Sequence, residues 1–169
     1  MKRKALVLAL AGGALWGQGA VPRPAPELKI TQGSGEIATL SSYRGRVVLL
    51  AFISTQCVHC QKASEVFEQL GREYAGKLQV AAVAFDEGAD VTAFKKRFGL
   101  TFPVGTSTSD AVHVFLGIPP GARLGTPQVV AIDRTGIIRA QSERLGTPML
   151  QTAEYLRGLL NAMLGRQSR

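Results

Sequence analysis

Apolar runs alternate along the chain with segments whose apolar residues follow a helical period. The run Val47–Ile53 is wholly apolar and has the length of a buried strand. A second run at Leu78–Phe85 has the same character. Two further strands are predicted at Gln128–Ile132 and Ile137–Ala140, joined by a turn at Asp133–Gly136.

A helical period begins at the first of two closely spaced cysteines and is predicted to end at Gly76, since glycine commonly terminates a helix. Its apolar positions are Ala63, Val66, Phe67, Leu70 and Tyr74, and its polar positions include Gln61, Lys62, Glu65, Glu68 and Arg72. The two sets lie on opposite sides of a helix. The pattern therefore predicts that the first set is buried and the second faces solvent.

Capping residues indicate three more helices. Asp90 precedes a segment of helical period, and Ser109 or Asp110 caps a short helix after it. Near the end of the chain, Thr147-Pro148 has the preferred order of a cap followed by a proline. Each of these residues is predicted to begin a helix.

The order of these elements predicts the fold class. Leu28–Ile30 and Ile37–Thr39 flank a turn and read as an N-terminal β-hairpin. Two strand–helix units follow, and then an antiparallel strand pair and a final helix. Parallel strands joined by helices, followed by an antiparallel pair, predict an α/β fold with a mixed central sheet and helices on both faces.

The N-terminus has the character of a targeting segment. Residues 1–4 are basic, residues 5–16 are apolar, and small residues follow up to position 20. Residues 1–20 are therefore predicted to be a signal peptide, or a membrane tether through residues 5–16 where they are not cleaved. A proline-rich spacer at 21–26 leads to a folded domain at 27–165. Export places the domain in the periplasm or another extracytoplasmic compartment of a bacterium, where conditions are oxidising.

Composition narrows the class of protein. The 169 residues suit one domain, and a hydrophobic content of 46% with a mean hydropathy of +0.11 excludes a disordered chain. The net charge is +8, but Lys2, Arg3 and Lys4 lie in the targeting segment, which leaves +5. The other cations are scattered, without a basic tract or interleaved aromatic residues, so the sequence argues against nucleic-acid binding.

Cys57 and Cys60 are the only cysteines, and they stand where the strand Val47–Ile53 changes into a helix. The free N–H groups and the dipole of a helix start favour a thiolate, which lowers the pKa of the first cysteine. In an oxidising compartment, an isolated CxxC pair indicates a working redox couple more than a structural disulfide, because a four-residue loop constrains the unfolded chain little.

This combination resembles the thioredoxin superfamily and, within it, the exported TlpA/ResA-like thiol-disulfide oxidoreductases of the AhpC/TSA group. The resemblance covers residues 27–164. Its most specific parts are the lead-in Leu40–Arg46, the strand that runs into Cys57-Val58-His59-Cys60, and Gly125-Thr126-Pro127 ahead of Val130–Gly136. It implies a thioredoxin-like fold with thiol-disulfide exchange as its activity.

The resemblance also implies roles for individual residues. Cys57 is expected to be the exposed nucleophile and Cys60 the buried resolving thiol. Val58 and His59 are expected to tune the couple, since a protonated His59 would stabilise the Cys57 thiolate. This predicts a more oxidising couple than that of cytosolic thioredoxin. A cis bond between Thr126 and Pro127 is expected beside the sulfurs, where the backbone of Thr126 pairs with the partner polypeptide.

Two departures from the pattern concern proton transfer. Ala51 and Ala63 stand where related proteins carry an acidic residue that accepts the proton of the resolving cysteine. Glu65 or Glu87 is the candidate substitute. No cofactor is expected besides the redox-active disulfide, and no metal. The expected partners are thiols or disulfides of exported proteins and an upstream redox partner.

Two alternative functions remain open on the sequence alone. Ser54 fits the place of the hydroxyl residue of a peroxiredoxin-like thiol peroxidase, although Leu50 stands where a proline is expected. A Cu(I)-binding metallochaperone would use Cys57, Cys60 and His113, since two thiolates and an imidazole suit Cu(I).

Overall fold

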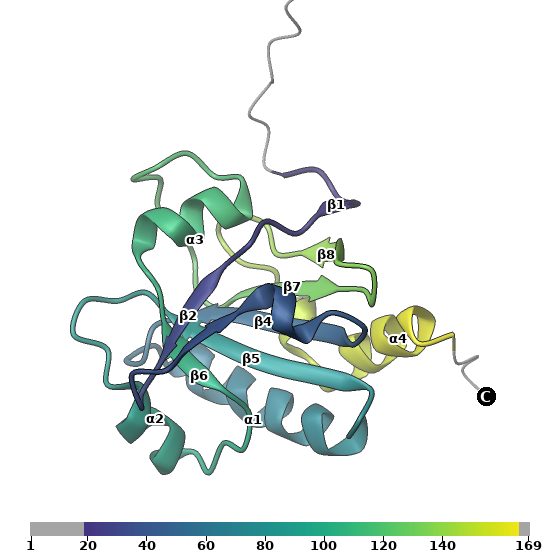
Figure 1. The fold of residues 1–169 in the computed structure, drawn as a ribbon, viewed down its shortest axis with the longest axis horizontal. Helices are drawn as coiled ribbons and strands as arrows, with labels where there is room; N and C mark the ends of the chain where they lie inside the picture. Colours follow the sequence, from purple (N-terminus) through teal and green to yellow (C-terminus); the bar gives the residue numbers. More distant parts are fainter. Residues whose placement is uncertain (1–18, 166–169) are drawn as a thin grey trace, which may run out of the picture.

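The structure, a computed structural model, describes residues 19–165 (Figure 1). The predicted signal peptide or tether therefore lies almost wholly outside the described residues. Within them, one mixed sheet has the strand order β1-β8-β7-β4-β5-β6-β2-β3. Its strands are β1 Arg23–Pro24, β2 Lys29–Gln32, β3 Ile37–Thr39, β4 Val47–Ile53, β5 Leu78–Ala84, β6 Val104–Thr106, β7 Gln128–Ile132 and β8 Ile137–Gln141. The helices are α1 Val58–Glu73, α2 Val91–Arg97, α3 Ser109–Leu116 and α4 Ala153–Met163, with 3-10 turns η1 Leu40–Tyr43 and η2 Pro148–Gln151.

Strand β4 lies at the centre of the sheet, with β5 parallel to it on one side and β7 antiparallel on the other. All seven of its residues are buried, as a strand covered on both faces requires. One set of alternate residues, from Val47 to Ile53, packs with α1 and α4, and the other set, with Phe52, packs with α3. Figure 1 shows α1 and α4 on one side of the sheet and α3 on the other. The predicted α/β class with helices on both faces is confirmed.

The sheet extends further at its edges than the sequence predicts. The hairpin β2–β3 forms as predicted and joins the sheet through antiparallel pairing of β2 with β6. At the other edge, the proline-rich spacer contributes β1, which pairs with β8. Arg23 anchors β1, because its Nη2 donates to the Phe115 carbonyl at 2.8 Å and to Gln141 Oε1 at 2.6 Å. An edge strand tolerates the neighbouring prolines, since they lack only an N–H group.

Two helix starts differ from their predicted positions. The residue that caps α3 is Thr108, whose hydroxyl accepts from the Ala111 N–H at 3.2 Å; neither Ser109 nor Asp110 has this role. After Thr147 the chain first forms the turn η2, and α4 begins only at Ala153. The order of elements is unaffected by either difference.

Glu68 was expected on the solvent face of α1, and this prediction is wrong. Its side chain is buried against the segment that follows α2, where its carboxylate accepts from the Thr101 N–H at 2.7 Å and the Thr101 hydroxyl at 2.8 Å. Arg72 adds an ion pair at 2.8 Å. Burial raises the pKa of Glu68, but these hydrogen bonds outweigh it and hold the pKa below its ordinary value.

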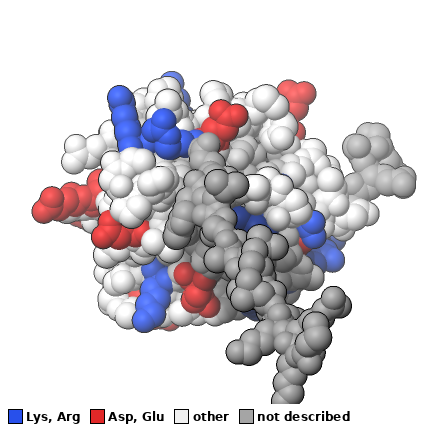
Figure 2. All heavy atoms as spheres, turned by 90° about the horizontal axis from the view of Figure 1, so that it is seen from above, with Lys and Arg blue, Asp and Glu red and all other residues white. Residues whose placement is uncertain are grey.

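Charged residues are spread over the surface. Figure 2 shows acidic and basic side chains interspersed among uncharged ones on the face in view, without a continuous basic surface. Among residues 19–165, no helix has the length and apolar character needed to cross a bilayer.

Glu68→Ala is expected to lower the free energy of unfolding by about 1–3 kcal/mol, because it removes the charged acceptor of two hydrogen bonds from Thr101. The exposed Gln69 on the same helix offers a matched control, and Gln69→Ala should change stability by less than about 0.5 kcal/mol. Urea unfolding at neutral pH measures both. Equal effects of the two substitutions would show that the contact with Thr101 contributes little.

Candidate active site

The two cysteines lie at the start of α1, directly beyond the carboxyl end of β4. Cys57 is the N-cap residue of the helix, and its Sγ accepts from the Cys60 backbone N–H at 3.3 Å. Cys57 is partly exposed, whereas Cys60, one turn into the helix, is fully buried. The structure thus confirms the predicted placement of one reachable sulfur in front of one buried sulfur.

The surroundings shift the two thiols in opposite directions. Burial by itself raises the pKa of Cys57, but hydrogen bonds from the side chains of Cys60 and Thr126 and from the N–H groups of Cys60 and His59 outweigh it, so the pKa lies below its ordinary value. Burial raises the pKa of Cys60 to about 12, and the neighbouring Cys57 contributes to the rise. Cys57 is therefore the thiol that ionises first, whereas Cys60 keeps its proton to a much higher pH.

The loop before β7 completes the site. The peptide bond between Thr126 and Pro127 is cis, as the resemblance implies. Cys57 Sγ lies 3.6 Å from the Thr126 carbonyl oxygen, to which the protonated form of the thiol donates. Segments 69 residues apart in the sequence are thus brought together at the nucleophile.

A carboxylate that sequence reasoning missed holds the loop in front of Cys57. Asp86, at the end of β5, accepts from the Thr55 hydroxyl at 2.8 Å and from the Thr55 N–H at 3.2 Å. A second hydrogen bond holds the same loop: the Cys57 N–H donates to the Ser54 carbonyl at 3.2 Å. The signal for Asp86 was its position directly after a buried parallel strand, adjacent to the strand that carries the cysteines.

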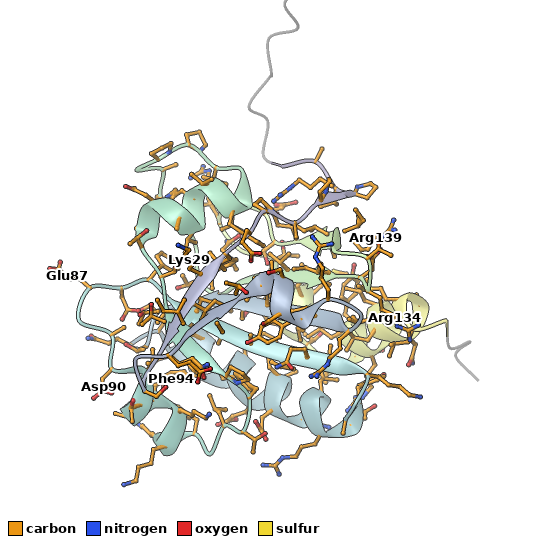
Figure 3. The ribbon with its side chains drawn as sticks, viewed as in Figure 1. Lys29, Glu87, Asp90, Phe94, Arg134 and Arg139 are labelled. Atoms are coloured by element: carbon orange, nitrogen blue, oxygen red, sulfur yellow. The ribbon has the colours of Figure 1, made fainter. Side chains whose placement is uncertain are left out.

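The remaining predicted site residues are spread around this centre. Val58 and His59 are exposed on the first turn of α1. Glu65 is exposed further along the same helix, and Glu87 lies in the loop after β5, where it points away from the sheet into solvent (Figure 3). In the described part of the chain, neither glutamate forms a hydrogen bond with Cys60, so a role of either as proton acceptor stays a prediction.

His113 is buried in α3, and both of its ring nitrogens are engaged. Nδ1 lies 2.7 Å from the Ser109 carbonyl oxygen and Nε2 lies 2.8 Å from the Ala122 carbonyl oxygen. No cluster of three potential His, Cys, Asp or Glu ligands occurs among the described residues. The structure therefore does not bring His113 to the cysteines as the Cu(I) alternative requires.

The comparison with family models decides which family this is. The model of the AhpC/TSA family matches residues 21–141, which span most of the chain and include both cysteines and the cis proline. The chain belongs to the AhpC/TSA family.

Two curated relatives and one solved structure are similar to this AhpC/TSA-family chain. Thioredoxin-like protein YneN of Bacillus subtilis is 38% identical over 84 residues, or 47% of this chain and 49% of YneN, so the chain matches about half of that protein's length. Thiol-disulfide oxidoreductase ResA of Geobacillus kaustophilus is 31% identical over 122 residues, or 71% of this chain and 67% of ResA. A putative protein disulfide isomerase from Bacteroides thetaiotaomicron is 29% identical with a TM-score of 0.67, covering 87% of this chain and 91% of that one.

These relatives agree with the geometry of the site. The fold is thioredoxin-like, and Cys57 and Cys60 have the arrangement of a CxxC redox couple. The described domain of this AhpC/TSA-family chain is therefore a thiol-disulfide oxidoreductase domain.

The opposite pKa shifts predict selective alkylation of the reduced protein. Iodoacetamide at pH 7 should modify Cys57, and the alkylation rate of Cys60 should be at least about a hundredfold lower. Only thiolates react, and Cys60 is both buried and protonated. Mass spectrometry of peptides after timed quenching measures both rates. Cys57→Ser should leave a protein that is nearly inert to the reagent; rapid labelling of Cys60 in that variant would contradict the assignment.

The same shifts predict how the stability of the reduced form depends on pH. A lowered pKa in the folded state adds stability as pH rises through that pKa, until the unfolded chain also ionises near its ordinary value of about 8.5. Above that pH the sign reverses, because Cys60 keeps its proton in the folded protein up to about pH 12.

The expected observation is a difference in thermal midpoint, reduced minus oxidised, that rises from acid pH to about 8.5 and then falls. Differential scanning calorimetry of both redox forms across this range provides the measurement. Cys57→Ser cannot form the disulfide, so its thermal midpoint is compared with that of the double variant Cys57→Ser/Cys60→Ser, and this difference should show the fall without the rise. A difference that does not change with pH would be incompatible with the opposite shifts.

Proposed function

We propose that the protein exchanges disulfides with exported proteins through the Cys57–Cys60 couple. The observation that carries this proposal is the difference between the two sulfurs: Cys57 is partly exposed at the helix start and has a lowered pKa, and Cys60 is buried one turn behind it. A structural disulfide needs no such asymmetry, whereas two-step exchange depends on it.

The reaction follows from this arrangement. The Cys57 thiolate attacks a disulfide of the partner, forming a mixed disulfide and releasing one partner sulfur as a thiolate. Cys60 then loses its proton and attacks Cys57 Sγ, which forms the Cys57–Cys60 disulfide and releases the second partner sulfur. Two electrons pass from the couple to the partner. An upstream redox partner restores the starting state, and the same steps in reverse oxidise a dithiol.

The surface around Cys57 suits a polypeptide partner. Val58 beside it is 59% exposed, an unusual degree for a valine. Leu145, whose backbone packs against Gly125 of the cis-proline loop, is 64% exposed. An exposed apolar side chain next to Cys57 and another on the loop that contacts the cis-proline loop favour contact with another protein. We expect the backbone of Thr126 to pair with an extended segment of that partner.

The proposed compartment rests on the N-terminal sequence. The basic start, short apolar stretch and small residues of positions 1–20 favour export across the bacterial inner membrane, with the domain either released into the periplasm or another extracytoplasmic space, or tethered through residues 5–16. An oxidising compartment also suits the couple, because its partners there carry disulfides.

Cys60→Ser is expected to trap the partner. Without the resolving thiol, the mixed disulfide on Cys57 persists, so a covalent adduct should be recovered from the exported fraction and released by dithiothreitol. Cys57→Ser is the matched control and should trap nothing. If the Cys60→Ser protein were to consume peroxide with a reducing system and form no protein adduct, peroxidase activity would replace exchange as the function.

The hydrogen bonds to Cys57 predict a couple that is more oxidising than cytosolic thioredoxin, because a stabilised thiolate stabilises the reduced form. Titration against glutathione measures the potential. His59→Ala should lower it by roughly 10–30 mV, since it removes an imidazole whose protonated form would stabilise the thiolate. Lys62→Ala, on the exposed part of the same helix, is the control for charge alone. A wild-type potential as low as that of thioredoxin would contradict the prediction.

A further inference from the structure

Gln128 is a buried polar residue at a position where the surrounding strand is apolar. It follows the cis proline directly and begins β7, whose other residues are Val129, Val130, Ala131 and Ile132. Its side chain is fully buried. A buried amide costs free energy unless it forms hydrogen bonds, so its presence here calls for a physical account.

The amide of Gln128 links two loops. Its Nε2 lies 2.6 Å from the Gly125 carbonyl oxygen, 3.0 Å from that of Glu143 and 3.1 Å from that of Arg144. Gly125 belongs to the cis-proline loop, and the other two residues belong to the loop that follows β8. Oε1 has no hydrogen-bond partner in the described residues. The amide orientation is nevertheless determined, because the reverse would point Oε1 at three carbonyl oxygens.

The two loops are held in close backbone contact. The Gly125 N–H donates to the Arg144 carbonyl at 2.9 Å. A Cβ atom on Gly125 would stand 2.2 Å from the Leu145 carbonyl oxygen, so this position has room only for glycine. With so little free space, the loop after β8 sets the position of Gly125. The Gln128 amide holds this loop and the cis-proline loop together.

The contact between the two loops is linked to the nucleophile through one residue, Thr126. Thr126 stands between Gly125 and Pro127, its carbonyl oxygen lies 3.6 Å from Cys57 Sγ, and its side chain helps to lower the Cys57 pKa. A shift of Gly125 by a few tenths of an ångström therefore changes the contacts of Cys57. Gln128 itself touches neither sulfur, so it acts through the loop.

We propose that Gln128 is a positioning residue, which holds Thr126 against Cys57 by clamping the cis-proline loop to the loop after β8. The geometry gives Gln128 two consequences at once: it keeps Thr126 in contact with the nucleophile Cys57, and it presents the backbone of Thr126 to a partner. The second consequence rests on the proposed exchange with protein partners, whereas the first does not.

The test is the pH profile of Cys57 alkylation in Gln128→Met, which keeps the volume and removes the donor. The midpoint should rise, and the rate on the acid side of the profile should fall about tenfold, the effect of losing one hydrogen bond to a charged group. With a disulfide-bonded protein substrate, KM should rise more than kcat falls. Gln79→Met is the matched control, because the Gln79 amide donates to the backbone carbonyl of the next residue, Val80, within strand β5 and links no loops.

Two further variants separate positioning from stability. Gly125→Ala should reproduce the shifted profile by a different route, since its Cβ forces the loops apart. Val80→Ala, a buried substitution in β5, should lower the thermal midpoint and leave the alkylation profile unchanged. Gln128→Glu donates one O–H only while its carboxyl is protonated, so its alkylation rate relative to wild type should fall as pH rises; this variant serves if Gln128→Met does not fold.

A profile that is unchanged in Gln128→Met and in Gly125→Ala would overturn the proposal. So would a shift of equal size in Val80→Ala, because the effect would then follow from stability alone. If the profile shifts but the wild-type protein exchanges no disulfides with protein substrates, the positioning role stands and the proposed function fails.

Discussion

One contact ties the chemistry of this domain to its fold: the hydrogen bond from the Cys60 N–H to Cys57 Sγ. The first N–H groups of a helix have no partner within the helix, and a side-chain acceptor at the N-cap commonly satisfies one of them. In α1 that acceptor is the sulfur of the nucleophile. The free N–H groups of the helix start thus stabilise a thiolate, because a charged sulfur accepts hydrogen bonds more strongly than a neutral one.

The sheet explains how a reactive group at a helix start is kept in place. Strand β4 is buried on both faces and ends directly before the loop that carries Cys57. Asp86 fastens this loop from β5, and Thr126 approaches from the loop before β7. Because β5 and β7 are the two neighbours of β4, residues after β5 and before β7 hold the site from both sides of the central strand. The nucleophile itself remains partly exposed.

The sequence predicts those parts of the fold that depend on local pattern. The apolar strand β4, the change to a helix at Cys57 and the two strands after Pro127 all follow from periodicity and turn residues. It does not predict features that depend on contacts between distant segments. Glu68 reads as a surface residue of α1 until Thr101 is placed beside it, and Arg23 reads as part of a linker until Phe115 and Gln141 supply acceptors.

The same limit applies to the site. Cys57, Cys60 and Pro127 are identified by their types and spacing, and the structure brings them together. Asp86 and Gln128 are not, because a carboxylate or an amide at the end of an apolar strand is compatible with a solvated turn. Only the fold shows that their partners are backbone groups of the loops on either side of the nucleophile. Positioning residues of this kind act on the backbone, which has no sequence signature.

Positions 51 and 63 carry alanine instead of an acidic proton acceptor, so Cys60 must lose its proton by another route. The causes of its high pKa suggest how. Burial is the largest of these causes, but the hydrogen bond and the charge of Cys57 also raise it. Both contributions exist only while Cys57 is a free thiolate. Once Cys57 is bonded to a partner sulfur they disappear, whereas the lowering influence of the Ser54 backbone does not depend on that charge. Formation of the mixed disulfide therefore makes Cys60 more acidic at the step that needs its thiolate, which reduces the demand on a separate carboxylate.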